Sequence, residues 1–267
     1  METISCPICN SSKFDNYLFL EDKYDLKGKK NFSIVKCLCN FIYLNPRPDQ
    51  NEIVKYYSDI SYSPHDKFSF FYKIAQKISF KWKYNFIKNN FSNCKILDYG
   101  SGKGDFGFYM NARGFEVTSY DPITSNIDIS NLKFNLITMW HSLEHIHDLD
   151  KTLTMFNNKL SPDGRLLIAV PNICAAEKKY LKTKWVAYDT PRHLYHFQKE
   201  SLENLINKYG FKIDCIKPIY QDTFFNIYKS LGLFNIIFFP LIFFVSIIEI
   251  LINKSKSSSQ LFVCSKI

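Results

Sequence analysis

The strongest constraint on the fold is a short run at residues 95–106, in which an apolar strand meets an acid, three alternating glycines and the start of a helix. Asp98 lies two residues before Gly100, and Gly102 and Gly104 follow at alternate positions. Glycines at this spacing let the backbone turn sharply and approach a ligand closely, because a Cβ would occupy the ligand's space. The run therefore predicts an α/β sheet with a ligand bound at the end of a strand.

Short apolar runs alternate with amphipathic stretches beyond this point, which favours a Rossmann-like, doubly wound, mostly parallel sheet with helices on both faces. The expected strands span 96–99, 116–120, 134–140, 165–170 and 211–219, and the expected helices span 105–113, 149–160 and 199–209. The Ser-Pro-Asp-Gly segment at 161–164 is expected to form a turn before its strand. We assign residues 95–267 to this domain.

The charge of Asp98 selects between two classes of cofactor. Gly102, Gly104 and Gly107 also match the G-x-G-x-x-G pattern of dinucleotide-binding loops, but the pyrophosphate of a dinucleotide would be repelled by the neighbouring carboxylate. S-adenosylmethionine instead carries an ammonium and a sulfonium, which a buried carboxylate stabilises. Asp121 follows the next expected strand, where an acid accepts hydrogen bonds from ribose hydroxyls. The loop therefore predicts S-adenosylmethionine.

The runs 96–106, 134–145 and 160–172 resemble class I S-adenosylmethionine-dependent methyltransferases, including the ubiquinone-biosynthesis O-methyltransferases. The resemblance covers residues 95–211 and implies an antiparallel last strand, expected at 259–265. The linker between Asp121 and Phe134 is shorter than the family usually has, so we expect an abbreviated third strand and helix. Together, the loop and the resemblance give these cofactor-binding candidates: Asp98, Gly100, Ser101, Gly102, Gly104, Asp121, Asp128 and His141.

Polar residues follow the strand at 134–140, at the sheet edge where ligands bind in open parallel sheets. His141 is a candidate base for removing a proton from the methyl acceptor. Glu144 and His145 are candidate substrate-binding residues. The alternative is that they begin a helix, with the carboxylate accepting hydrogen bonds from its first N–H groups.

A second polar cluster occupies residues 189–197, a segment that the resemblance places over the substrate pocket. His193 is the leading candidate for the catalytic base, with a structural role as the alternative. His196 is expected to pack against it or orient it. Arg192 is a candidate for holding an anionic group of the substrate.

Residues 1–48 combine Cys6-Pro-Ile-Cys9 with Cys37-Leu-Cys39 in a β-rich stretch too small to fold on its own core. Four thiolates at such positions predict a structural Zn²⁺ ion. The alternative is a lost site whose cysteines persist as small apolar residues. The stretch also resembles the N-terminal zinc module of bacterial surface-polysaccharide methyltransferases, although its second cysteine pair is spaced more closely. A helical lead-in is expected at 49–94.

Residues 231–252 form the longest apolar run, nearly long enough to cross a bilayer. The strands on either side of it must pair in one sheet, which excludes a single crossing. We therefore expect an apolar helical insertion at 223–256, a hairpin broken at Pro240, with peripheral membrane contact through 228–254. The lysine-rich stretch 178–185 would lie on anionic lipid. A homodimer interface is the alternative.

The net charge of +9 arises from scattered lysines with only four arginines, so no nucleic-acid partner is expected. The first nine residues lack a signal-peptide pattern, which predicts a cytoplasmic protein. The expected peripheral contact through 228–254 would then be with the inner face of the membrane. The expected function is O-methylation of a sugar, a lipid-linked glycan intermediate or a prenylated quinone precursor, with a histidine base. The alternative is a non-catalytic zinc-containing adaptor that docks on membrane or glycan-synthesis enzymes.

Overall fold

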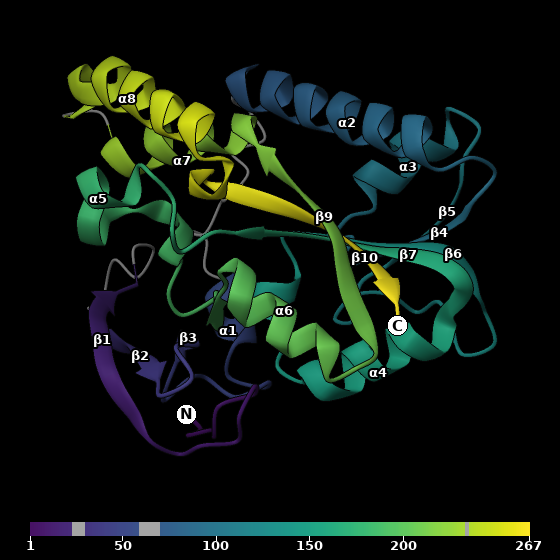
Figure 1. The fold of residues 1–267 in the computed structure, drawn as a ribbon, viewed down its shortest axis with the longest axis horizontal. Coiled ribbons are helices and arrows are strands. Elements are labelled where there is room, and N and C mark those ends of the chain that lie inside the picture. The colour runs from purple at the N-terminus through teal and green to yellow at the C-terminus, as the bar shows by residue number, and fades with distance from the viewer. Residues whose placement is uncertain (23–29, 59–69, 233–234) are drawn as a thin grey trace.

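The computed structural model describes residues 1–22, 30–58, 70–232 and 235–267. Small parts of the expected cysteine module, helical lead-in and apolar hairpin lie outside the described residues. The described strands form two sheets, a six-stranded sheet of order β5-β4-β6-β7-β10-β9 and a four-stranded sheet of order β1-β2-β3-β8. The larger sheet occupies the middle of the molecule, with helices above and below it (Figure 1).

The six-stranded sheet confirms the predicted fold class. Its strands are β4 (Lys95–Tyr99), β5 (Glu116–Tyr120), β6 (Phe134–Trp140), β7 (Leu160–Pro171), β9 (Phe211–Ile219) and β10 (Ser259–Lys266). The first four run parallel, while β10 lies between β7 and β9 and is antiparallel to both. The segment between β5 and β6 contains no helix or strand, as the short linker predicted. Strands β6 and β7 are buried on both faces, which explains their nearly continuous apolar sequences.

Helices cover both faces of this sheet (Figure 1). One side carries α2 (Phe70–Asn90), α3 (Asp105–Asn111), α7 (Tyr220–Leu231) and α8 (Phe239–Ile252). The other side carries α1 (Val54–Ser58), α4 (Leu149–Lys159), α6 (Lys199–Asn207) and the four-stranded sheet. The short helix α5 (Lys178–Leu181) follows β7.

Two local predictions concerned segments that contain proline. The turn expected at residues 161–164 lies within the bounds of β7, where the pairing moves from Phe134↔Leu160 to Leu136↔Arg165, so these residues bulge out and regular pairing resumes at Arg165 as expected. Pro240 does not break the apolar hairpin but lies in the first turn of α8, where its missing N–H is not needed. The chain leaves α7 at Gly232, whose φ of 62° ends the helix.

The N-terminal sheet takes one strand from a much later part of the chain. Strands β1 (Phe14–Glu21), β2 (Asn31–Cys37) and β3 (Ile42–Leu44) form an antiparallel meander. Strand β8 (Tyr195–His196) then pairs with β3. Phe41 stacks against Tyr195 at a ring distance of 5.8 Å, so the two regions share one core.

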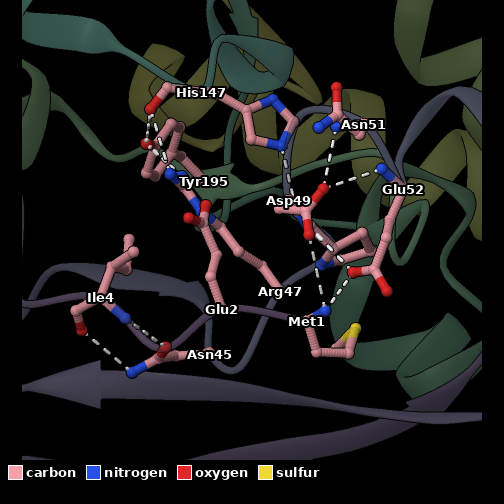
Figure 2. A network of polar contacts seen from close by, with 11 residues as sticks. Met1, Glu2, Ile4, Asn45, Arg47, Asp49, Asn51, Glu52, His147 and Tyr195 are labelled. Atoms are coloured by element: carbon pink, nitrogen blue, oxygen red, sulfur yellow. Dashed lines mark hydrogen bonds and ion pairs between the residues drawn. The ribbon is translucent and has the colours of Figure 1, made fainter.

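Arg47 holds the beginning of the chain against this junction (Figure 2). Its Nε donates to Glu2 at 2.7 Å, and its terminal nitrogens donate to the Tyr195 hydroxyl at 2.7 Å and to the His147 carbonyl at 3.1 Å. The Asn-Pro-Arg-Pro segment that closes the cysteine region is therefore bonded to residues from two later parts of the chain.

Arg192 forms a second connection between the N-terminal region and the segment at 189–197. Its side chain is 1% exposed and lies between Asp22, at 2.7 Å, and Asp189, at 2.9 Å. Asp22 belongs to the N-terminal region, whereas Asp189 precedes the predicted base His193. The two carboxylates offset the cost of burying the guanidinium charge, so this ion pair fixes the segment after residue 189 to the N-terminal sheet.

We predict that Arg192→Met lowers the free energy of unfolding by roughly 3–5 kcal/mol, because it removes the cation from the buried carboxylate of Asp22 and the partly buried carboxylate of Asp189. Urea denaturation measures the change. Arg165→Met is the matched control, since its ion pair with Asp214 is partly exposed and should contribute less than about 1 kcal/mol. Equal losses for the two variants would contradict a special role for the buried pair.

Candidate active site

The glycine loop between β4 and α3 has the backbone geometry that only glycine adopts readily. Gly100, Gly102 and Gly104 have φ values of 75°, 55° and 75°. A Cβ on Gly100 would lie 2.4 Å from the Cβ of Ser142, so packing excludes one. A Cβ on Gly102 would meet no atom within 4 Å. The loop is thus tightly packed on one side and open on the other, as a cofactor-binding loop requires.

Asp98 lies beneath this loop at the end of β4 and is 3% exposed. The Thr138 hydroxyl donates to its Oδ1 at 2.9 Å. Burial raises the pKa of Asp98 to about 6, although the hydrogen bond from Thr138 and the charge of Lys83 oppose the change. No ion pair with Asp98 occurs within 4 Å in the described part of the chain, so this carboxylate fits the cation of S-adenosylmethionine.

Lys83 is a site residue that sequence reasoning missed. It extends from α2, and its Nζ lies 4.7 Å from the centre of the Trp140 ring and 5.2 Å from that of Phe106. Burial lowers the pKa of Lys83 to about 8, while Asp98 and Asp222 act against this. Lys83 is one of several lysines on the long helix α2, and no spacing pattern in the sequence connects it with Asp98. The sequence therefore did not single it out.

Asp121 lies at the end of β5 as predicted and faces the glycine loop. Its Oδ2 accepts the N–H of Gly102 at 3.1 Å, and its Oδ1 accepts those of Ile123 and Thr124. These bonds shape the turn after β5 and leave the carboxylate beside the open side of the loop. Ser101 takes part through its N–H, which donates to the Tyr120 carbonyl at 3.2 Å.

Asp128, another of the predicted cofactor-binding candidates, is exposed on the linker between β5 and β6. Both of its oxygens accept hydrogen bonds from Ser130, one from the N–H and one from the hydroxyl. Its carboxylate thus stabilises its own loop, and no bond connects it with the glycine loop among the described residues.

His141 follows β6 with a φ of 54°, an uncommon conformation for a residue with a side chain. Its Nε2 lies 2.9 Å from Asp222 of α7, and its Nδ1 lies 3.6 Å from Glu144. Burial lowers the pKa of His141, but the two carboxylates outweigh it and raise the pKa to about 10. His141 is therefore a cation at neutral pH, and Asp222 is a partner that the sequence did not reveal.

Glu144, His145 and His193 form a compact group, with potential ligand atoms within 4.8 Å of one another. Glu144 is fully buried. Burial opposes its ionisation, but His141, His145 and His193 lower its pKa to about 2. The rings of His145 and His193 contact each other at 4.7 Å. The structure thus brings together three site residues predicted from two separate segments.

The two ring nitrogens of His193 have different surroundings. Nδ1 lies 2.8 Å from the Ala187 carbonyl, an acceptor, so Nδ1 carries a proton. Nε2 lies 4.0 Å from Asp189. In the neutral ring, Nε2 consequently holds the lone pair.

His196 and Arg192 have mainly internal surroundings. His196 belongs to β8, and burial together with the charge of His193 lowers its pKa to about 3. Its ring lies 6.5 Å from that of His193, in keeping with a packing role. Arg192 points into the interface with the N-terminal sheet and is satisfied by Asp22 and Asp189. The structure therefore gives its guanidinium a structural role and does not present it to a substrate anion.

Comparison with known proteins decides the family. A family model described as a methyltransferase domain matches residues 66–216, more than half of the 267 residues. The chain belongs to this methyltransferase family. It is an S-adenosylmethionine-dependent methyltransferase, in agreement with the loop and Asp98.

Individual relatives of the methyltransferase are distant. The ubiquinone biosynthesis O-methyltransferase of Rickettsia canadensis (strain McKiel) is 21% identical over 172 residues, covering 53% of this chain and 72% of the relative. The structure of the mitomycin 7-O-methyltransferase MmcR has a TM-score of 0.47 and 13% identity, and the match covers 71% of this chain and only 54% of the MmcR chain. An S-adenosylmethionine-dependent methyltransferase from Archaeoglobus fulgidus has a TM-score of 0.46 and 15% identity, and the match covers 74% of this chain and 100% of the Archaeoglobus chain.

The four cysteines of the methyltransferase's N-terminal region meet at one point. Their sulfur atoms lie within 4.8 Å of one another, with Cys6 and Cys39 at 3.5 Å and Cys9 and Cys37 at 3.4 Å. The closely spaced second pair therefore supplies two sulfurs to the same cluster as the first. Such a cluster has the donor set of a structural zinc site.

We predict that the methyltransferase binds S-adenosylmethionine more weakly as the pH falls below about 6, because protonation removes the charge of Asp98. Binding should be unchanged above this pH and about tenfold weaker one unit below it. Calorimetric titration across this range measures the effect.

Two variants test the assignment of this pH dependence. Asp98→Asn should bind weakly at every pH and lose the dependence. Lys83→Met should move the decline to higher pH, because the lysine charge lowers the pKa of Asp98. A wild-type affinity that stays constant down to about pH 5 would contradict the role of Asp98.

Proposed function

We propose that this methyltransferase transfers a methyl group to an oxygen atom of a small molecule, with His193 as the base. The observation that carries the proposal is the bond between Nδ1 of His193 and the Ala187 carbonyl, which leaves Nε2 to accept a proton. His141 is a poorer base because Asp222 keeps it protonated. We therefore assign His141 to positioning and to the cofactor side of the site.

When bound, S-adenosylmethionine supplies an activated methyl group whose transfer from sulfur to oxygen is an in-line displacement. Asp98 and the glycine loop would hold its charged end, and Asp121 would hold its ribose. The acceptor's hydroxyl proton passes to Nε2 of His193 as the new oxygen–carbon bond forms. The buried carboxylate of Glu144 stabilises the resulting imidazolium, and His145 packs against its ring.

The proposed acceptor is a sugar, a lipid-linked glycan intermediate or a prenylated quinone precursor. The distant relative from Rickettsia canadensis supports an oxygen acceptor by its name. A histidine base also suits a hydroxyl group, whose proton must be removed.

We predict that His193→Ala lowers kcat by roughly 10²–10⁴-fold with unchanged affinity for S-adenosylmethionine. Labelled S-adenosylmethionine and lipid or polysaccharide extracts of the native cell provide the assay, followed by kinetics on the labelled product. His147→Ala is the control, since that ring binds the Pro48 carbonyl away from the cluster. A larger loss for His141→Ala than for His193→Ala would reverse the assignment, and cofactor binding without any transfer would favour the adaptor.

We further propose that Cys6, Cys9, Cys37 and Cys39 hold a structural Zn²⁺ ion. Tetrahedral zinc with sulfur ligands at 2.3 Å places the sulfurs about 3.8 Å apart, close to the distances found here. The ion would stabilise the turns on either side of β1 and β2, where few apolar residues are available.

We predict about one zinc per chain in the purified protein, measured by mass spectrometry of the metal content. Cys9→Ser should reduce the zinc content and the melting temperature. Cys215→Ser should retain the metal, because that cysteine lies on β9 outside the cluster. A wild-type protein that is stable and free of zinc after expression with added metal would refute this site.

A further inference from the structure

Helix α8 presents apolar side chains on the side that faces away from the protein. Large exposed residues recur at spacings of three and four, so they form a stripe along one face of the helix. They are between 39% and 66% exposed and comprise Leu241, Phe244, Ile248 and Leu251. Ile237, in the 3₁₀ turn just before α8, is 79% exposed. A continuous apolar stripe of this kind marks an interaction surface rather than ordinary scatter.

The opposite face of α8 is packed against helix α7. Phe239 and Phe243 pack against Phe224 of α7 at ring distances of 4.9 and 5.7 Å. The helix is thus apolar all round, with one side on the protein and the other side open. Such helices are buried in a protein or lie in lipid.

The position of α8 leaves this stripe accessible. Helices α8 and α2 are the outermost elements on the same side of the central sheet (Figure 1). On α2, Ile74 and Ile78 are also exposed, and Lys73, Lys77 and Lys81 lie on the same helix. This side of the molecule therefore combines apolar and basic groups on two helices.

Charge around the hairpin selects the kind of partner. The only acids among the described residues 220–256 are Asp222 and Glu249, which form ion pairs with His141 and Lys179. Lys229 lies near the end of α7, and Lys254 is exposed just after α8. Lys182 is exposed just after α5, whose Lys179 forms the ion pair with Glu249 of α8. The hairpin thus combines exposed apolar side chains and exposed lysines, and its two acids are already paired with cations. This combination matches an anionic bilayer surface.

The dimensions favour binding at the surface. No helix in the described part of the chain is long and apolar enough to span a membrane. Helix α8 has 14 residues. That corresponds to about 21 Å, short of the ~30 Å hydrocarbon core. The hairpin also returns to the sheet, where Ser259 of β10 pairs with Ile219 of β9.

We infer that the α7–α8 hairpin docks the protein on an anionic membrane, with α8 lying along the surface. The stripe enters the boundary between headgroups and acyl chains, while the lysines contact lipid phosphates. Trp185 takes no part, contrary to the sequence expectation, because it is 1% exposed and donates to Glu177.

Docking also bears on the acceptor, a consequence that rests on the proposed function. Helix α7 carries Asp222, the partner of His141, in its first turn and packs against α8 further along. The docking hairpin is therefore joined directly to the active-site edge of the sheet. An acceptor that resides in the bilayer is the class that this arrangement serves.

Vesicle co-sedimentation of the full chain tests the inference. We expect binding to vesicles of phosphatidylcholine with phosphatidylglycerol and much weaker binding to phosphatidylcholine alone. Leu241→Asp/Phe244→Asp should reduce partitioning on the order of a hundredfold, because two large apolar groups are removed from the stripe. Lys229→Glu/Lys254→Glu should reduce binding to anionic vesicles about tenfold or more. Phe19→Asp is the matched control, an exposed aromatic on β1 of the other sheet.

The variants must retain wild-type melting temperatures and affinity for S-adenosylmethionine, which their exposed positions favour. Equal sedimentation of wild type and Leu241→Asp/Phe244→Asp would overturn the inference. The inference would also be overturned if the wild type formed a stable dimer and did not sediment with vesicles, while this variant was monomeric. The stripe would then be an interface between two copies. None of these readouts requires methyl transfer, so failure of the proposed reaction would leave the membrane result intact.

Discussion

A single buried cation organises the relation between the two sheets. Arg192 has almost no exposure to water, and its charge is tolerated because Asp22 and Asp189 lie on either side of it. Removing any of the three would leave uncompensated charge in the interior. The segment that follows Arg192 contributes His193 to the histidine cluster and β8 to the smaller sheet. The position of the proposed base therefore depends on a contact with the first 22 residues of the chain.

The site itself is divided electrostatically. On the cofactor side, Asp98 is ionisable near neutral pH, and Lys83 is the described residue whose charge lowers its pKa. On the acceptor side, burial and neighbouring charges lower the pKa values of His145 and His196, which makes those rings neutral. His141 lies between these regions as a cation held by Asp222. In the proposed reaction, this separation would let one end of the site attract the cationic cofactor while the other accepts the proton of the acceptor.

Periodicity predicted the central sheet well, because its inner strands β6 and β7 are buried on both faces and its helices α4 and α6 are amphipathic. Strands β5, β6 and β9 have the bounds expected from their apolar runs. The glycine loop was predictable because its chemistry is written in consecutive residues. Lys83, Asp222 and strand β8 were not, since each depends on a contact between distant segments. The role of Arg192 was misjudged for the same reason, as its partner Asp22 lies 170 positions away in a region of different character.

Strand β8 has a consequence for how such proteins can be recombined. Because Tyr195 and His196 complete the sheet built by residues 14–44, the cysteine region is not a detachable appendage. A chimaera that exchanged it for the corresponding part of a relative would also need the matching acid for Arg192 and a matching edge for β8. Evolution faces the same restriction, so the N-terminal region and the 189–197 segment should be inherited as one unit even though the whole cofactor-binding half of the chain separates them.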